Sequence, residues 1–197
     1  VRSDWSSDVC SSDLLLLMIM VALFRYGRYW STPGNPEVLV EKSIAVLPFK
    51  NESSDSSNLY FVNGLMESTL NNLQKIKDLR VISRSSVEIY RNSDKTIREI
   101  AEELQVSYFI EGSGQKVGDQ VLLNIQLIDA KGDRQIWAEQ YNRKLVDIFA
   151  LQNEVATKIA HAIEAIVTPA ELEQIKKKPT DNLVAYDFYL QALDPFY

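Results

Sequence analysis

Cysteine and histidine are almost absent from this sequence, whose 197 residues include one of each. A single cysteine cannot form a disulfide within the chain, and disulfide-stabilised domains need several pairs. Zinc sites take three or four ligands, chiefly cysteine, histidine and carboxylate side chains. The composition therefore excludes a disulfide framework and a zinc cluster of cysteine and histidine, and we expect no cofactor.

The chain also lacks an excess of positive charge. It has 21 lysine and arginine residues against 27 aspartate and glutamate residues, a formal net charge of −6. Proteins that bind nucleic acid neutralise its phosphates with basic stripes or patches. No nucleic-acid partner is therefore expected for this chain. A hydrophobic share of 46% and a charged share of 24% are ordinary for a globular protein, so a packed core is expected.

The apolar run Leu14–Phe24 is too short to cross a membrane by itself. It supplies about half of the roughly 20 apolar residues that a spanning helix needs. Arginines and aromatic residues follow it up to Trp30, a mixture typical of a membrane interface. Both a truncated transmembrane helix at residues 15–30 and the core of a signal peptide fit this pattern. We favour the helix, because no small-residue cleavage site follows.

Two further segments stand apart from the expected fold. Residues 1–14 have no hydrophobic period and resemble the translation of a sequencing adapter joined to a truncated gene, so we exclude them from the fold. Residues 31–42 contain Pro33, Gly34 and Pro36, which cannot continue a helix. We expect this second segment to be a linker that leads into the domain.

What the sequence does contain is an alternation of strand and helix patterns over residues 43–167. Buried strands are predicted from short apolar runs, amphipathic helices from stripes that recur every three or four residues, and exposed strands from alternation. The predicted strands lie at 44–47, 79–83, 106–111, 121–128 and 135–141, and the predicted helices at 61–73, 97–104 and 148–163. The order β-α-β-α-β-β-β-α indicates an α/β fold: a mixed sheet of about five strands with helices packed on it.

Helical segments are expected to follow the domain at residues 168–197. Thr168 and Glu171 have the spacing of a capping box, as Thr96 and Glu99 have before the helix at 97–104. Asp147 is expected to cap the helix at 148–163. The last helix carries an apolar stripe that we expect to need a partner, formed by Tyr186, Tyr189, Leu190 and Leu193.

The residues that most suggest chemistry have simpler explanations. Gly112-Ser113-Gly114 resembles a phosphate loop, but a strand rather than a helix follows it, so a hairpin turn is predicted. His161 lies off the apolar stripe of its helix, and no second ligand accompanies it. Trp137 is expected to pack with Tyr141 under the last domain helix, with a contact to a peptide or glycan as the alternative. No nucleophile, base and oxyanion donor can be named together, so an enzyme is not expected.

A candidate edge for a ligand or partner follows from the parallel strands. Ligands of open sheets gather beyond the carboxyl ends of such strands. Two segments meet this condition after the first and second strands: Lys50 with Asn51, and Arg84 with Ser85 and Ser86. Their cations, amide and hydroxyls would suit a carboxylate, a phosphate or an acidic peptide. The alternative is structural, with Ser85 capping a helical turn and Arg84 paired with a nearby acid.

Several segments together carry a resemblance to a known family. They are SIAVLPF with YFVNGLMESTLNNL, IREIAEELQVSYFIEGS, LLNIQLIDA, QIWAEQYNR and DIFALQNEVATKIA. These segments resemble the TolB amino-terminal-domain-like family, a module related to FlgO. The resemblance covers nearly all of residues 43–167 and departs from the family pattern at Asn63, where Asp is common, and at Gly114, where an apolar residue is common.

This resemblance implies a non-catalytic module that senses a signal or binds a protein or peptide partner. Proteins with this module often carry it between a transmembrane helix and tetratricopeptide repeats. Their other part is commonly a winged-helix regulator or an adenylate cyclase. The resemblance thus implies a bacterial inner-membrane protein with the domain in the periplasm, and tetratricopeptide repeats beginning in residues 168–197. A structural envelope module of FlgO type is the alternative.

Overall fold

The computed structural model describes residues 18–23 and 42–193. The first range is helical and belongs to a separate compact unit from the second. Within these two ranges, no helix combines the length and apolar character that crossing a membrane requires. The expectations for residues 1–14, for most of the proposed membrane segment and for nearly all of the linker concern residues outside the described ranges.

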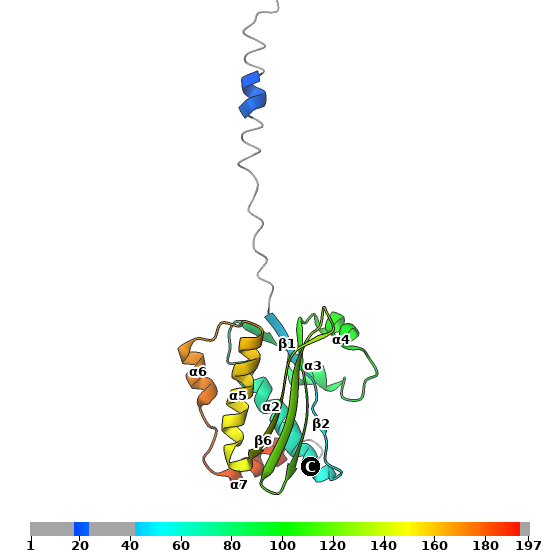
Figure 1. Ribbon diagram of the computed structural model, residues 1–197, viewed down its shortest axis with the longest axis vertical. Coiled ribbons are helices and arrows are strands. Elements are labelled where there is room, and N and C mark those ends of the chain that lie inside the picture. The colour runs from blue at the N-terminus through cyan, green and yellow to red at the C-terminus, as the bar shows by residue number, and fades with distance from the viewer. Residues whose placement is uncertain (1–17, 24–41, 194–197) are drawn as a thin grey trace, which may run out of the picture. The chain divides into compact units, whose positions relative to one another are not determined.

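A mixed six-stranded sheet organises residues 42–193 (Figure 1). Five strands stand in the order β3-β1-β4-β5-β6, while the short β2 pairs with β4. β1 is parallel to β3 and β4, and β4, β5 and β6 form an antiparallel meander. The predicted fold class is confirmed, with β2 as an addition. The strands are β1 Lys42–Val46, β2 Lys50–Asn51, β3 Leu79–Val81, β4 Tyr108–Val117, β5 Gln120–Asp129 and β6 Arg134–Lys144.

Two long helices, α2 and α5, contact each other and pack against the strands of the sheet. Their buried side chains, among them Leu65 and Met66 of α2 and Val155 and Ile159 of α5, belong to one apolar core with the sheet. Short 3-10 turns at Ser56–Asn58 and Leu145–Asp147 precede these two helices. The helices are α2 Leu59–Leu73, α3 Arg84–Glu88, α4 Ile97–Leu104, α5 Ile148–Ala162, α6 Pro169–Lys176 and α7 Leu183–Leu193.

The helix starts follow local sequence signals closely. Thr96 and Glu99 form the predicted capping box of α4: the Thr96 hydroxyl accepts from the Glu99 amide at 3.3 Å, and the Glu99 carboxylate accepts from the Thr96 amide at 2.8 Å. The same arrangement opens α6 at Thr168. Asp147 occupies the N-cap position of α5, but its side chain makes no capping hydrogen bond. A preceding 3-10 turn brings the chain to this helix instead.

The predicted hairpin turn at Gly112-Ser113-Gly114 is wrong, because these residues lie inside β4. The turn falls at Gly118, whose φ of +60° is a left-handed conformation that suits glycine. Gly112 is needed for close packing instead. A β-carbon there would lie 2.8 Å from the buried ring of Phe49. A glycine signal for a turn and one for close packing look alike in sequence.

Helix α7 packs on the same body, so part of the apolar stripe that was expected to need a partner finds one within this domain. Tyr186 and Leu190 are buried, and the Tyr186 ring meets the Phe149 ring of α5 edge-on at 4.8 Å. Asp187 accepts a hydrogen bond from the Tyr60 hydroxyl at 2.7 Å and from Lys116 at 3.1 Å. The rest of the α7 surface stays open, including Val184, Phe188 and Tyr189.

Candidate functional site

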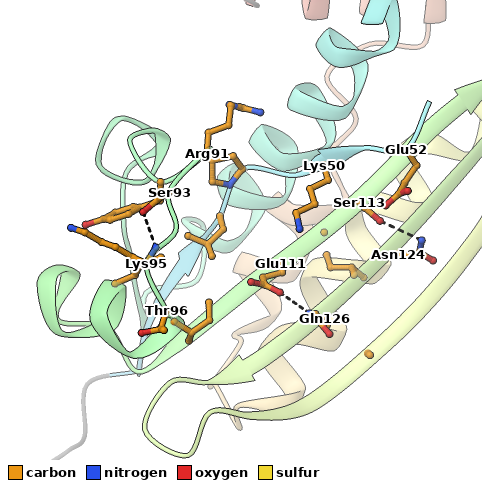
Figure 2. A pocket seen from close by; sticks show the side chains of 18 of the residues that line it. Lys50, Glu52, Arg91, Ser93, Lys95, Thr96, Glu111, Ser113, Asn124 and Gln126 are labelled. Carbon is orange, nitrogen blue, oxygen red and sulfur yellow. Dashed lines mark hydrogen bonds between the residues drawn. The ribbon is translucent and has the colours of Figure 1, made fainter. Parts of the chain in front are cut away.

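A groove of about 840 Å³ lies over the face of β4, β5 and β6 that points away from the core (Figure 2). We call it the sheet groove. Its floor comes from polar side chains of these strands, and one wall from the segment between α3 and α4. Leu47, Ile97 and Ile100 form the apolar end of the groove. Lys50, in β2, and Glu52, which follows β2, also line the groove.

The floor is polar because successive side chains of a strand point to opposite faces. In β5, Val121, Leu123 and Ile125 face the core, so Asn124 and Gln126 face the groove. Gln126 donates to the Glu111 carboxylate at 2.7 Å, and Asn124 donates to the Ser113 hydroxyl at 3.4 Å, each across one strand pair (Figure 2). These bonds hold the floor side chains in place and leave further polar atoms for a ligand.

The wall carries charges that already have partners. Glu103 accepts from Lys95 at 2.5 Å and from the Tyr90 hydroxyl at 2.7 Å. The bond from Lys95, followed by that from Tyr90, lowers the pKa of the Glu103 carboxyl, and the bond to Glu103 raises the pKa of the Tyr90 phenol. Glu103 therefore stays ionised and neutralises Lys95.

Arg91 is held in a similar way where the wall meets α2. Its guanidinium pairs with the Glu88 carboxylate and donates to Asn63 Oδ1 at 3.0 Å. Asn63 is 2% exposed and occupies the position at which the resemblance expects Asp. The neutral amide supplies an acceptor for Arg91 without a second negative charge beside Glu88.

Lys50 and Glu52 differ from the wall residues. Both side chains are exposed, and among the described residues neither has a hydrogen bond or ion pair. The backbone beneath them is fixed, since Lys50 pairs with Ser113 of β4 and the Glu52 amide donates to the Gly114 carbonyl at 3.0 Å. One free cation and one free anion therefore stand at defined places beside the floor.

Of the five residues predicted for a binding edge, Lys50 alone lines the sheet groove. The amide of Asn51 instead organises its own turn, through bonds with the Asp55 carbonyl and the Ser53 amide. Arg84 lies 3.3 Å from Glu67 of α2, as the structural alternative supposed. The hydroxyl groups of Ser85 and Ser86 each form a hydrogen bond with the hydroxyl group of Ser83.

Ser83, rather than Ser85, occupies the N-cap position of α3. Sequence reasoning also missed most of the groove. The polar half of the β5 alternation could have indicated its floor, because it marks an exposed sheet face. The wall at residues 90–96 has no comparable signal, since only the fold brings it beside the strands.

The remaining candidates lie away from the groove or pack in the core. His161 is exposed on α5 and does not line the sheet groove. Trp137 packs partly buried against the core and Tyr141 is buried, in agreement with the packing interpretation. Lys158 of α5 forms an ion pair with Glu139 at 2.7 Å, and Glu139 lies between Trp137 and Tyr141 along β6. In the part of the chain that the structure describes, no cluster of three or more potential metal ligands occurs.

Comparison with known proteins finds a curated relative that is named as a cyclase. It is 36% identical over 157 residues to "Putative adenylate cyclase 3" of Rhizobium meliloti (strain 1021), an alignment that covers 80% of this chain and 27% of that protein. The chain thus spans about a quarter of its curated relative. Both the relative and the family matched below agree with the regulator and cyclase setting that the sequence resemblance implied.

Solved structures with a related arrangement are more distant. TolB from Acinetobacter baumannii is 18% identical with a TM-score of 0.47, over 61% of this chain and 28% of that chain. Lipoprotein GNA1162 from Neisseria meningitidis is 18% identical with a TM-score of 0.46, over 60% and 96%. Among the family models, the second domain of HilA/YgeH-like transcriptional regulators matches residues 40–158 of this chain. The chain therefore belongs to the family of HilA/YgeH-like transcriptional regulator second domains.

Proposed function

We propose that this domain is a non-catalytic sensing or protein-interaction module of a bacterial signalling protein, and that it recognises its partner or ligand through the sheet groove. The observation that carries the proposal is a roomy groove with a hydrogen-bonded floor, beside which the exposed side chains of Lys50 and Glu52 have no partner among the described residues. Such concave sites with a few placed polar groups are the usual form of ligand pockets. Family membership supports a regulatory setting, and an adenylate cyclase domain elsewhere in the whole protein fits the curated relative.

A bulky charge in the groove should disturb signalling without disturbing the fold. Gln140 lines the groove and is exposed, so Gln140→Arg fills the site at little cost to the core. Gln174→Arg, on exposed α6 surface, is the matched control. We expect the full-length protein with Gln140→Arg to change the transcript profile and cyclic AMP level of its host at equal protein abundance, and the control to leave both unchanged. A purely structural envelope module predicts no response to either variant.

We further propose that residues 15–30 tether the protein to the inner membrane and that the domain at 43–167 lies in the periplasm, before helical segments at 168–197 that begin a repeat region. Support comes from the apolar run with its interfacial flank and from the family resemblance. The full-length protein should resist carbonate extraction, and protease added to spheroplasts should cleave the domain. Release by carbonate would contradict the tether, and cleavage only after lysis would place the domain in the cytoplasm.

A further inference from the structure

We propose that the sheet groove binds a small apolar zwitterion, a free amino acid or a dipeptide with an aliphatic side chain. The inference rests on the proposed function, because it names the ligand class of the same groove. Lys50 would take the carboxylate and Glu52 the ammonium group. The apolar end at Leu47, Ile97 and Ile100 would take the side chain.

The first step is the state of the charges around the groove. On the wall, Lys95 is neutralised by Glu103 and Arg91 by Glu88. On β6, Glu139 is neutralised by Lys158. Three charged side chains of the lining are left over, with no ion pair among the described residues: Lys50, Glu52 and Glu111, the last of which accepts a hydrogen bond from Gln126. A ligand that carries one charge of each sign places a carboxylate on Lys50 and an ammonium group beside an acid, whereas an anion alone is repelled by the two carboxylates and a cation alone leaves Lys50 unpaired.

The second step is the placement of two of these charges. Lys50 and Glu52 are two residues apart along the segment that pairs with β4, so both backbones are held against the sheet. Two residues of a strand span about 6.5 Å and point to the same face. This span suits the two ends of an amino acid or dipeptide better than those of a long peptide. Phe49, directly before Lys50, is buried in the core and anchors the segment.

The third step is the neutral lining. Gln126, Asn124 and Gln140 offer amide groups, which match the hydrogen-bonding pattern of a peptide bond. Glu111 accepts a hydrogen bond from Gln126 and adds a second carboxylate to the lining. At the apolar end, Leu47 and Ile100 are buried and Ile97 is partly exposed, so an aliphatic side chain would complete an existing cluster.

Four probes separate the contributions of the two ligand charges. Leucine carries both charges, N-acetylleucine the carboxylate alone and leucinamide the ammonium group alone, while leucyl-leucine tests whether a dipeptide fits better. Binding would be followed by backbone amide shifts in the 197-residue chain at about pH 6.5, where the amines are protonated. We expect leucine and leucyl-leucine to shift the signals of Lys50, Ser113 and Gln126, with both single-charge analogues weaker.

The charge variants should act with opposite selectivity. Lys50→Gln should weaken leucine and N-acetylleucine about fivefold to tenfold and spare leucinamide, because one charged hydrogen bond is lost. Glu52→Gln should weaken leucine and leucinamide but strengthen N-acetylleucine. Lys131→Gln, an exposed lysine that does not line the groove, is the control and should change none of these affinities. All three variants replace exposed side chains, and their melting temperatures should match that of the wild type.

Equal binding of leucine and both analogues, or equal effects of both variants on every probe, would overturn the zwitterion assignment. Absence of groove shifts with all four probes would overturn it as well. The proposed function fails separately, if Gln140→Arg leaves transcripts and cyclic AMP unchanged. A response to Gln140→Arg with no binding of these probes would leave the groove as the signalling site and remove its amino-acid ligand.

Discussion

Replacing Phe49 with alanine is expected to lower the free energy of unfolding by about 3–5 kcal/mol, the usual cost of removing a buried phenylalanine ring. Phe49 is 1% exposed and lies between β1 and β2, with its ring against Gly112 of β4. Its loss leaves a cavity under the segment that presents Lys50. Urea unfolding of the whole chain measures the effect. Lys50→Ala, one residue along and exposed, should stay within about 0.5 kcal/mol of the wild type.

The contact between Phe49 and Gly112 can also be tested from its other side. In Gly112→Ala the new methyl group would lie 2.8 Å from the ring, and we expect a loss of about 1–3 kcal/mol from overpacking. In the double variant Phe49→Leu with Gly112→Ala, the smaller side chain makes room for the methyl group. The double variant should therefore lose less free energy of unfolding than the two single variants lose together. Strict additivity would mean that this contact does not constrain the groove.

Replacing Leu190 with alanine is expected to lower the free energy of unfolding by about 2–5 kcal/mol. Leu190 is 3% exposed on α7 and packs on α2 at Gly64. The matched control is Val184→Ala on the same helix, where the side chain is 64% exposed and the change should be within about 0.5 kcal/mol. Urea unfolding of the whole chain again provides the measurement. Equal effects of the two substitutions would show that α7 does not stabilise the domain.

Gly64 offers a second test of the same helix contact, because the effect of Gly64→Ala on stability should reverse when α7 is removed. A β-carbon at Gly64 would lie 2.6 Å from a Leu190 methyl group, so Gly64→Ala should destabilise the whole chain. In a chain that ends before Leu183 the obstacle is gone, and alanine should then stabilise α2 by about 0.5–1 kcal/mol relative to glycine. Destabilisation of the shortened chain would contradict this account. A chain limited to residues 43–167 would test whether that range suffices for the fold, which stays a prediction.

The sequence by itself determined most of the elements, because each of these depends on a local pattern. The alternation over residues 121–128 became β5, and the stripe from Phe61 to Leu73 became one face of α2. The capping box of Thr96 and Glu99 set the start of α4, since its donors and acceptors lie within four residues of one another. The order of these elements, with helices between the first three predicted strands, also indicated parallel pairing and the α/β class.

The tertiary structure alone decided which residues share a site. Lys50 and Arg84 both follow the ends of parallel strands, yet Lys50 lies over the open sheet face while α3 turns Arg84 toward Glu67 of α2. The side to which a chain turns after a strand depends on packing with distant segments, and no local period encodes it. Gly112 shows the same limit, because its role depends on a ring 63 positions away in the sequence, that of Phe49. The sheet groove depends on the fold in the same way, because residues of the segment 90–96 line it together with residues of β4 and β5.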